Sequence, residues 1–345
     1  MPCVAQQEAS LSIRRCNLTS FFEQQAWFEL LLRDGMEASP QSLHALPMLS
    51  MTGQEVGRLH LMRPQGQRLL RSVDTYYSPV FGPVWRHDVS EPVRWLDVSV
   101  LIKQLPDAGV LRLQPLESEG QFLLNMLQAL RSTGYAVDRY FCFGNWYEPI
   151  AGRSFADYWR QRPSRLRNTV ERARRRLDQK HTWRTEVLTH DGPTLEQAIE
   201  AFQTVYARSW KQPEPCSGFM PGLIRMAASM GALRLGQLWL DGEVVASQVW
   251  LVYGGKANIY KLAYVPGHEK LSPGSLLTAA LMQHVIDADK VSEVDYLMGD
   301  DAYKQDWVTH RRERVGLVAF DCWRWRGLLA WLRHQAGRLV RRWRS

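Results

Sequence analysis

The sequence has few cysteines, and none of them is paired in sequence. The five cysteines are scattered over 345 residues without a C-x-x-C spacing: Cys3, Cys16, Cys142, Cys216 and Cys322. An odd, scattered set argues against a disulfide framework and a zinc knuckle, and favours a reducing compartment. The H-E-x-x-H, P-loop and G-x-G-x-x-G motifs are also absent. We therefore predict no metal site. The P-loop and G-x-G-x-x-G, which are nucleotide-binding motifs, give no support for a nucleotide site.

Long apolar runs are absent as well. No stretch is long enough to cross a bilayer, and residues 1–15 lack the apolar segment of a secretory signal. We therefore expect a cytoplasmic protein. Its net charge is +8, but seven arginines and no acidic residue follow Cys322. Subtracting these seven charges leaves +1 for the rest, so the body of the protein is nearly neutral.

Residues 323–345 carry the clearest helical pattern in the chain. At a helical period one face is apolar: Trp325, Leu328, Leu329, Leu332, Ala336, Leu339, Val340 and Trp343. Arginines occupy the other face, and only Trp331 breaks the pattern. An apolar face bordered by arginine and tryptophan is typical of a helix lying on an anionic membrane surface. The pattern predicts peripheral association with the inner face of the cytoplasmic membrane; the alternative is a helix docked on its own protein or on a partner.

Four segments follow from the pattern of apolar and polar residues. Residues 11–150 mix helices and strands. Residues 151–182 predict a helical arm whose second helix has an apolar stripe at Leu166, Val170, Ala173 and Leu177. Its arginines either face solvent or bind phosphate, including that of RNA. Residues 183–321 predict the order strand, helix, helix, three strands, helix, strand, short helix, strand, and residues 322–345 form the basic tail.

One stretch, "EVDYLMGDDAYKQDW" at 293–307, places reactive side chains together after a strand. An apolar run from Val294 to Met298 predicts the buried strand, and it stops at Gly299. Asp300, Asp301, Tyr303, Lys304 and Trp307 follow within nine residues. A turn requires glycine and one aspartate at most. An aspartate that caps the next helix is the alternative explanation, but it accounts for only one of these residues.

The order of elements and several motifs resemble the Gcn5-related N-acetyltransferase (GNAT) superfamily. The motifs are "LAYVPGHEKLSPGSLL" at 262–277, "DYLMGDDAYKQDW" at 295–307, "YYSPVFGPVW" at 76–85 and "RPSRLRNTVERARRRL" at 162–177. Together they resemble the CelD-type branch, which is named for cellulose-biosynthesis loci and related to the Fem-type aminoacyl transferases. The resemblance implies an α/β fold with tandem GNAT-like halves, mixed central sheets flanked by helices, and a degenerate first half.

The resemblance also implies an acyl-donor site in the second half. In a GNAT fold the pyrophosphate of coenzyme A lies on backbone N–H groups at a helix N-terminus. In this sequence the matching residues are Lys270, Ser272, Gly274, Ser275 and Leu276. Glu269 and Ser272 depart from the usual superfamily pattern at two positions. The alternative is an ordinary capped helix start after a turn.

The resemblance assigns roles to the residues after the strand. Asp300, or second Asp301, is the expected general base for an amine, and Tyr303 is placed to protonate a leaving thiolate. Lys304 holds an anionic substrate group or pairs with an aspartate, and Trp307 forms a pocket wall.

Trp210 and Lys211 lie on a loop that is expected to contact substrate; a surface loop is the alternative. We expect N-acyl transfer, most simply from acetyl-CoA or another acyl-CoA to an amino group of an envelope or exopolysaccharide-related precursor. Aminoacyl-tRNA is the alternative donor, and a non-catalytic, membrane-associated binding protein of a polysaccharide-synthesis system is the alternative class.

Overall fold

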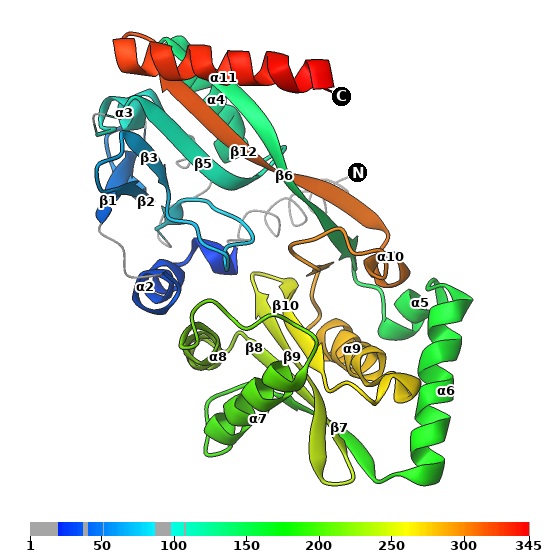
Figure 1. Cartoon of the computed structure of the whole chain (residues 1–345). Coiled ribbons are helices and arrows are strands. Elements are labelled where there is room, and N and C mark those ends of the chain that lie inside the picture. The colour runs from blue at the N-terminus through cyan, green and yellow to red at the C-terminus, as the bar shows by residue number, and fades with distance from the viewer. Residues whose placement is uncertain (1–19, 37–40, 51, 87–97, 107, 345) are drawn as a thin grey trace, which may run out of the picture. The chain divides into compact units, whose positions relative to one another are not determined.

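The computed structural model describes residues 20–36, 41–50, 52–86, 98–106 and 108–344, without the side chains of 98, 99 and 339–344. The chain forms two compact units (Figure 1). Of the described residues, unit 1 contains Ser20, Phe21 and the span from Asn145 to Arg312. Unit 2 contains those from Phe22 to Gly144 and from Glu313 onward. Two long strands, β6 (Tyr135–Pro149) and β12 (His310–Asp321), contribute residues to both units.

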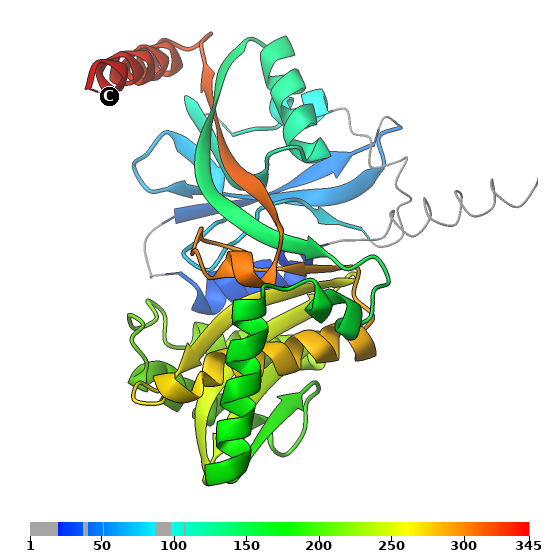
Figure 2. The same cartoon turned by 90° about the vertical axis from the view of Figure 1, so that its right-hand side faces the viewer.

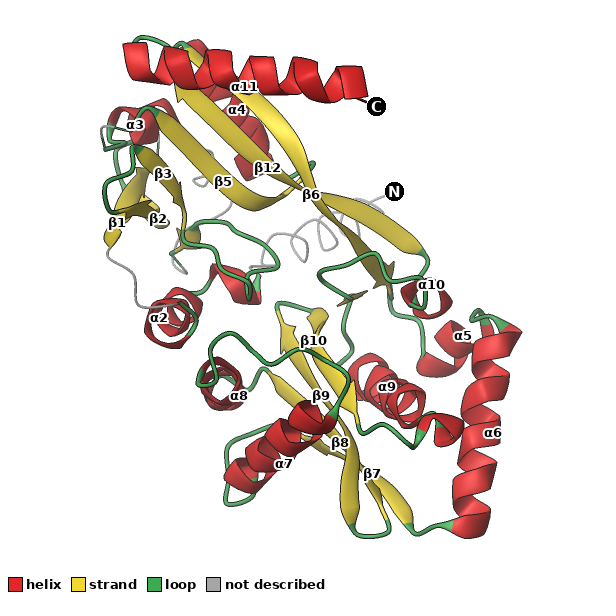
Figure 3. Ribbon diagram, in the orientation of Figure 1, coloured by secondary structure: helices red, strands yellow, loops and turns green. Residues whose placement is uncertain are grey.

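Unit 2 has a mixed sheet with the strand order β1-β2-β3-β5-β12 (Figure 3). Its strands are β1 (Gln41–Leu49), β2 (Glu55–Pro64), β3 (Leu69–Ser72), β4 (Val84–Trp85), β5 (Val110–Glu117) and the greater parts of β12 and of β6, which lies next to β12. Its helices are η1 (Phe21–Glu23), whose first residue belongs to unit 1, α2 (Gln25–Asp34), α3 (Val98–Lys103), α4 (Gln121–Ser132) and α11 (Trp325–Arg344). β3 and β5 are parallel, and the other pairs whose register is described are antiparallel.

Unit 1 has the strand order β6-β11-β10-β9-β8-β7. Its elements are α5 (Phe155–Arg160), α6 (Ser164–Lys180), β7 (Trp183–Leu188), α7 (Leu195–Arg208), α8 (Phe219–Ser229), β8 (Leu233–Leu240), β9 (Glu243–Tyr253), β10 (Lys256–Tyr264), η3 (Glu269–Leu271), α9 (Pro273–Gln283), η4 (His284–Ala288), β11 (Glu293–Asp295) and α10 (Lys304–Trp307). This sequence of elements confirms the predicted order. The last buried strand is shorter than predicted, because it ends at Asp295 rather than at Met298.

Helices cover both faces of the sheet in unit 1. A Cβ added at Gly236 would meet Leu281 of α9, whereas the side chain of the next residue, Gln237, donates to the carbonyl of Ala198 in α7. Consecutive side chains of a strand point to opposite faces, so α9 and α7 lie on opposite faces. α6 packs against the outer side of α9 (Figure 2).

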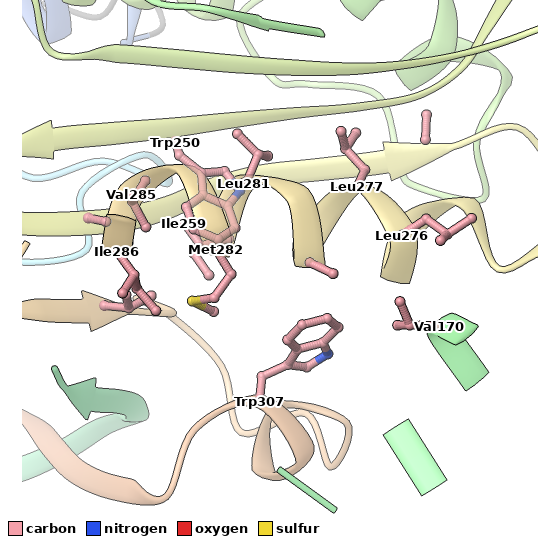
Figure 4. Close-up of a cluster of buried hydrophobic side chains, with 14 of the residues drawn as sticks. Val170, Trp250, Ile259, Leu276, Leu277, Leu281, Met282, Val285, Ile286 and Trp307 are labelled. Atoms are coloured by element: carbon pink, nitrogen blue, oxygen red, sulfur yellow. The ribbon is translucent and has the colours of Figure 1, made fainter. Parts of the chain in front are cut away.

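The core of unit 1 fixes the position of α9. Leu277 and Leu281 of α9 belong to the same buried cluster as Trp250 and Ile259 of the sheet, and Leu281 lies beside Trp250 (Figure 4). The predicted stripe on α6 is confirmed: Leu166, Val170, Ala173 and Leu177 are all buried in the same cluster. Each buried aliphatic side chain of this size stabilises the fold by about 1.5–3 kcal/mol. The N-terminus of α9 is therefore held rigidly beside the end of β10.

Candidate functional site

The loop after β11 begins with a sharp turn built on a buried aspartate. Asp295 accepts hydrogen bonds from the Leu297 backbone N–H (2.6 Å) and from the Asn145 side chain (2.5 Å). Leu297 has a positive φ of 53°, which ends the extended conformation and explains why the strand stops early. Gly299 also has a positive φ, of 99°, and a Cβ there would lie 3.0 Å from a carboxylate oxygen of Asp301. Glycine is required at this position.

The buried side chain of Lys304 holds this loop in place by hydrogen bonds to its backbone. Its side chain is 4% exposed, and its Nζ donates to the carbonyls of Met298 (2.6 Å) and Gly299 (3.0 Å). The same Nζ lies 3.1 Å from Asp301. Burial lowers the pKa of Lys304, and the hydrogen bond to Asp301 opposes that shift. Of the two roles expected for Lys304, the structure shows pairing with an aspartate.

Asp300 and Asp301 lie in different environments. Asp300 receives two hydrogen bonds from Arg311, at 2.8 and 2.6 Å, and one from the indole N–H of Trp146 at 3.0 Å. The hydrogen bond from Arg311 is the main reason why the pKa of Asp300 lies below its usual value. The side chain of Asp301 is 60% exposed, and Lys304 is its ion-pair partner. Asp301 is therefore the more accessible carboxylate of the two.

Helix capping does not explain either aspartate. The N-cap of α10 is Tyr303, and no side chain makes a capping hydrogen bond there, so this alternative is wrong. Tyr303 is 45% exposed and meets Tyr296 edge to face, with 6.2 Å between ring centroids. A tyrosine phenol is protonated at neutral pH at its ordinary pKa of about 10, and burial raises the pKa of Tyr303 further. The phenol is thus a proton donor at the surface of the loop.

A buried polar network holds the first turn of α9. Gln248 of β9 donates to the carbonyl of Gly274 (3.0 Å) and to Thr278 (2.9 Å), and it accepts from the indole of Trp250 (2.9 Å). A Cβ added at Gly274 would lie 3.3 Å from the ring of Tyr264. The missing side chain lets the end of β10 and the start of α9 approach each other closely.

Two backbone donors remain open at this helix start. Ser272 is in the left-handed conformation and its hydroxyl does not cap the helix, so the ordinary serine-capped start is not what the structure shows. Leu276 N–H donates to the Ser272 carbonyl, and the Leu276 side chain is buried. Within the described chain, the N–H groups of Gly274 and Ser275 donate to no protein acceptor. Open donors at a helix N-terminus attract anions.

The flanks of this helix start are basic. Arg176 of α6 donates to the carbonyl of Lys270 at 2.8 Å, which fixes the turn before α9, and the Lys270 side chain is exposed. Glu269 accepts hydrogen bonds from the Gly267 N–H, and these lower its pKa. Glu269 therefore stabilises the turn in which it lies. The two open N–H groups of the helix start, with the exposed Lys270 beside them, are donors that suit a pyrophosphate group.

The loop of Trp210 and Lys211 connects the two parts of the candidate site. The indole of Trp210 packs on Tyr264, with 4.5 Å between ring centroids, and Tyr264 also contacts Gly274. Lys211 is close enough to Asp301 and Lys304 for their charges to affect its pKa. Burial, followed by the charge of Lys261, lowers the pKa of Lys211. The structure thus brings together the predicted residues of the loop, the helix start and the strand exit.

Only part of the neighbouring edge of β10 pairs with another strand. β10 and β11 are parallel, and they pair from Lys256 opposite Glu293 as far as Asn258 opposite Asp295. Beyond Asn258, no described strand pairs with this edge of β10. An extended ligand with amide groups can add to such an edge by backbone hydrogen bonding.

Trp307 does not join this constellation. Its side chain is buried in the core of unit 1 (Figure 4), and its ring lies 5.9 Å from the ring of Trp159. Its carbonyl accepts hydrogen bonds from Tyr158 (2.6 Å) and Arg162 (2.8 Å). In the part of the chain that the structure describes, no group of three or more His, Cys, Asp or Glu residues is placed to hold a metal ion.

Sequence reasoning missed Arg311, Trp146 and Tyr264. Arg311 is the second residue of β12, and Trp146 comes from β6, more than 150 positions earlier in the chain than Asp300. No spacing rule connects residues so far apart. Tyr264 lies within the quoted motif at 262–277, and its aromatic side chain just before the turn was the available signal.

The architecture and this helix start define a GNAT-like α/β fold. Residues 164–305 match a protein-family model described as "Acetyltransferase (GNAT) domain", which covers less than half of the chain. No curated protein sequence matches the chain.

Three solved structures are similar over most of the chain. FemX is 12% identical with a TM-score of 0.62, covering 91% of this chain and 95% of its own. The C-terminal domain of a protein named as a lysylphosphatidylglycerol synthetase from Agrobacterium fabrum is 13% identical with a TM-score of 0.52, covering 86% and 87%. L-PGS from Bacillus licheniformis is 12% identical with a TM-score of 0.50, covering 86% and 92%. At these identities the similarity concerns the fold.

Proposed function

We propose that the protein is an N-acyltransferase that transfers an acyl group, most simply acetyl from acetyl-CoA, to a primary amine. The observation that carries this proposal is that the α9 start, the Trp210–Lys211 loop and the loop after β11 lie near one another. Trp210 packs on Tyr264, whose ring lies beside Gly274, and the charge of Asp301 acts on Lys211. An anion site and groups that can transfer protons thus lie in the same region of unit 1. The match of residues 164–305 to a GNAT domain model supports the same reaction class.

The donor end uses the start of α9. The open N–H groups of Gly274 and Ser275 bind the pyrophosphate of the donor, and the exposed Lys270 adds a positive charge. The unpaired edge of β10 beyond Asn258 orients the amide-containing arm of coenzyme A by backbone hydrogen bonds. The bound donor supplies the activated thioester.

The reacting end uses Asp301 and Tyr303. An ammonium acceptor must lose a proton before its nitrogen can attack, and the exposed carboxylate of Asp301 takes it, directly or through water. Asp300 is the second choice in this geometry, because its ion pair with Arg311 and its lowered pKa make it a weaker base. Tyr303, which is protonated at neutral pH and exposed, donates a proton to the leaving sulfur.

Lys211 binds an anionic group of the acceptor. No carboxylate of the described chain forms an ion pair with it, although Glu214 nearby pairs with Lys261 at 2.7 Å. An acceptor that carries both an amine and a phosphate or carboxylate fits this arrangement. The resemblance to CelD-type proteins favours an envelope or exopolysaccharide-related precursor.

Aminoacyl-tRNA is the second candidate donor. The fold similarity to FemX and to proteins named for lysylphosphatidylglycerol synthesis supports it, as do the exposed arginines of α6, among them Arg172 and Arg175. A binding protein without catalysis is the third candidate. The accessible Asp301 and Tyr303 favour an enzyme over that role.

The tail supports a location at an anionic membrane. α11 packs against the sheet of its own unit through Trp331, whose ring lies 5.4 Å from that of Phe320 in β12. The predicted apolar face points away: Trp325, Leu328, Leu329 and Leu332 are all exposed. The arginines beside this face attract anionic lipid, at about 1 kcal/mol each. Within the described residues, no helix is long and apolar enough to cross a membrane.

Steady-state turnover of acetyl-CoA with a panel of amines tests the proposal. Asp301→Asn and Tyr303→Phe should each lower kcat by about 10²-fold or more while the protein remains folded. Asp300→Asn is the matched control and should cost less, because Arg311 already occupies that carboxylate. Equal rates for the Asp301 and Tyr303 variants and the unmodified protein would remove these residues from the reaction.

A further inference from the structure

Unit 2 contains a cavity that the acyl-transfer chemistry does not use. Its volume is about 870 Å³, and it lies between α11 and the sheet strands β3, β5, β6 and β12. Its apolar lining includes Leu69, Val318 and Phe320, and its polar floor is formed by Gln114 and Tyr140. Binding cavities for small molecules commonly have volumes of about 300–1,000 Å³ and a mainly apolar lining.

Glycines allow the walls of this cavity to form. Tyr140 crosses β12 at Gly316, where any Cβ would overlap the phenol ring. At the start of α11, a Cβ on Gly327 would overlap the backbone of Asp321. The tyrosine ring and the helix therefore reach their places only because these two residues lack side chains.

Several contacts hold α11 over the cavity, among them a hydrogen bond from Arg338 to Asp138. Trp331 packs on Phe320, and His334 forms a 2.7 Å hydrogen bond with Asp138 of β6. Burial raises the pKa of Asp138, but hydrogen bonds from His334 and the Arg139 N–H outweigh it and lower the pKa overall. α11, which covers the cavity, is thus held in place on the side facing β6.

The charged side chains that line the cavity are arginines. Four arginines, Arg68, Arg112, Arg326 and Arg333, line the cavity, and no carboxylate does. Arg112 and Arg333 are exposed, and neither forms an ion pair with a described residue. The half-buried Asp74, which is not among the lining residues, accepts hydrogen bonds from Ser72 and from Gln114 of the floor. An apolar cavity with unpaired arginines at its edge is suited to a ligand with an apolar body and an anionic end.

We propose that this cavity binds an anionic amphiphile with a single acyl chain. The chain lies against Leu69, Val318 and Phe320, and Arg112 and Arg333 bind a phosphate or carboxylate head. A free inorganic anion would leave the apolar lining unused, and a neutral chain would leave the arginines unpaired. The cavity belongs to unit 2, so its occupancy does not depend on the donor site proposed for unit 1.

Titration calorimetry on the full chain tests this proposal with dodecyl phosphate below its micelle concentration. We expect saturable binding at one site per chain. Decyl phosphate should bind about tenfold more weakly, because two methylene groups are left out. Dodecanoate distinguishes a carboxylate from a phosphate head, and inorganic phosphate should not bind measurably. Equal affinity for dodecyltrimethylammonium would overturn the proposal, since a cationic head cannot use the arginines.

Variants locate the ligand. Arg112→Gln and Arg333→Gln should each weaken dodecyl phosphate about tenfold or more. Arg131→Gln removes one exposed charge from α4 of the same unit, outside the cavity, and should have no effect. Ala330→Trp fills the cavity and should abolish binding; circular dichroism checks that this variant is folded. An equal loss in the Arg131 variant, or unchanged binding in both Arg112 and Arg333 variants, would contradict a specific site.

Discussion

Replacing Lys304 by methionine separates loop stability from catalysis. The ammonium of Lys304 is buried, and it donates to the carbonyls of Met298 and Gly299. Methionine has a similar volume and fits an apolar environment, but it cannot donate hydrogen bonds. The change leaves two carbonyl oxygens without their donor and frees the loop that presents Asp301 and Tyr303.

The magnitude follows from these contacts. A hydrogen bond from a charged donor stabilises a protein by about 1.5–3 kcal/mol, so two of them contribute at least about 3 kcal/mol. Burial of the ammonium costs free energy, as its lowered pKa indicates, and methionine removes that cost. The ion pair with the exposed Asp301 adds less than about 1 kcal/mol. We expect a net loss of about 2 kcal/mol, which corresponds to about 4–8 °C in Tm for a unit of this size.

Urea unfolding followed by circular dichroism and tryptophan fluorescence measures this loss. Asp301→Asn is the matched control, because it removes the exposed partner and leaves both carbonyl contacts in place. It should cost less than about 1 kcal/mol. If Lys304→Met is as stable as the unmodified protein, the lysine does not fasten the loop, and a direct role in binding substrate becomes the better explanation.

Three further predictions concern other parts of the molecule. Gly299→Ala should cost about 1–3 kcal/mol in thermal unfolding, because φ is 99° and a Cβ would press on Asp301; unchanged stability would show that the loop adapts. Glu148 is buried, and hydrogen bonds from Thr309 and Arg153 outweigh the effect of burial and lower its pKa. The ionised carboxylate therefore stabilises the fold above the ordinary glutamate pKa of about 4.3, and this stabilisation is lost as the pH falls through the lowered pKa. Denaturation of Glu148→Gln from pH 7 to pH 3 should therefore show the gap to the unmodified protein closing in acid, and a constant gap would contradict this. Leu328→Ser with Leu332→Ser should reduce flotation with anionic vesicles at least tenfold at unchanged Tm, because both side chains are exposed; equal flotation would exclude this face from membrane binding.

Local patterns in the sequence predicted a large part of the fold. The stripe on α6 follows from helical spacing alone, because its apolar residues recur every three or four positions. The start of α9 follows from Pro273 and Gly274, which favour a helix start after a turn. These features depend on a few neighbouring positions, so the chain order is sufficient to predict them.

Contacts between distant residues could not be predicted in this way. The pairing of Asp300 with Arg311 and Trp146 depends on how β6 and β12 flank the loop. The tail shows a second limit. Its periodicity separates an apolar face from a basic one, but the structure docks the helix through Trp331, which appeared to be an exception to the pattern. Which face of an amphipathic helix is buried depends on the surface that receives it.

Calorimetric titration of the protein with acetyl-CoA tests the central claim most directly. Gly274→Glu places a side chain and a negative charge at the open donors of α9, and Gly192→Glu adds the same charge in a loop of unit 1 where nothing lies within 4 Å. We expect the unmodified protein and the Gly192 variant to bind equally well and the Gly274 variant to bind at least tenfold more weakly. Equal binding by all three proteins would place the donor elsewhere, and no binding by the unmodified protein would rule out acetyl-CoA as the donor.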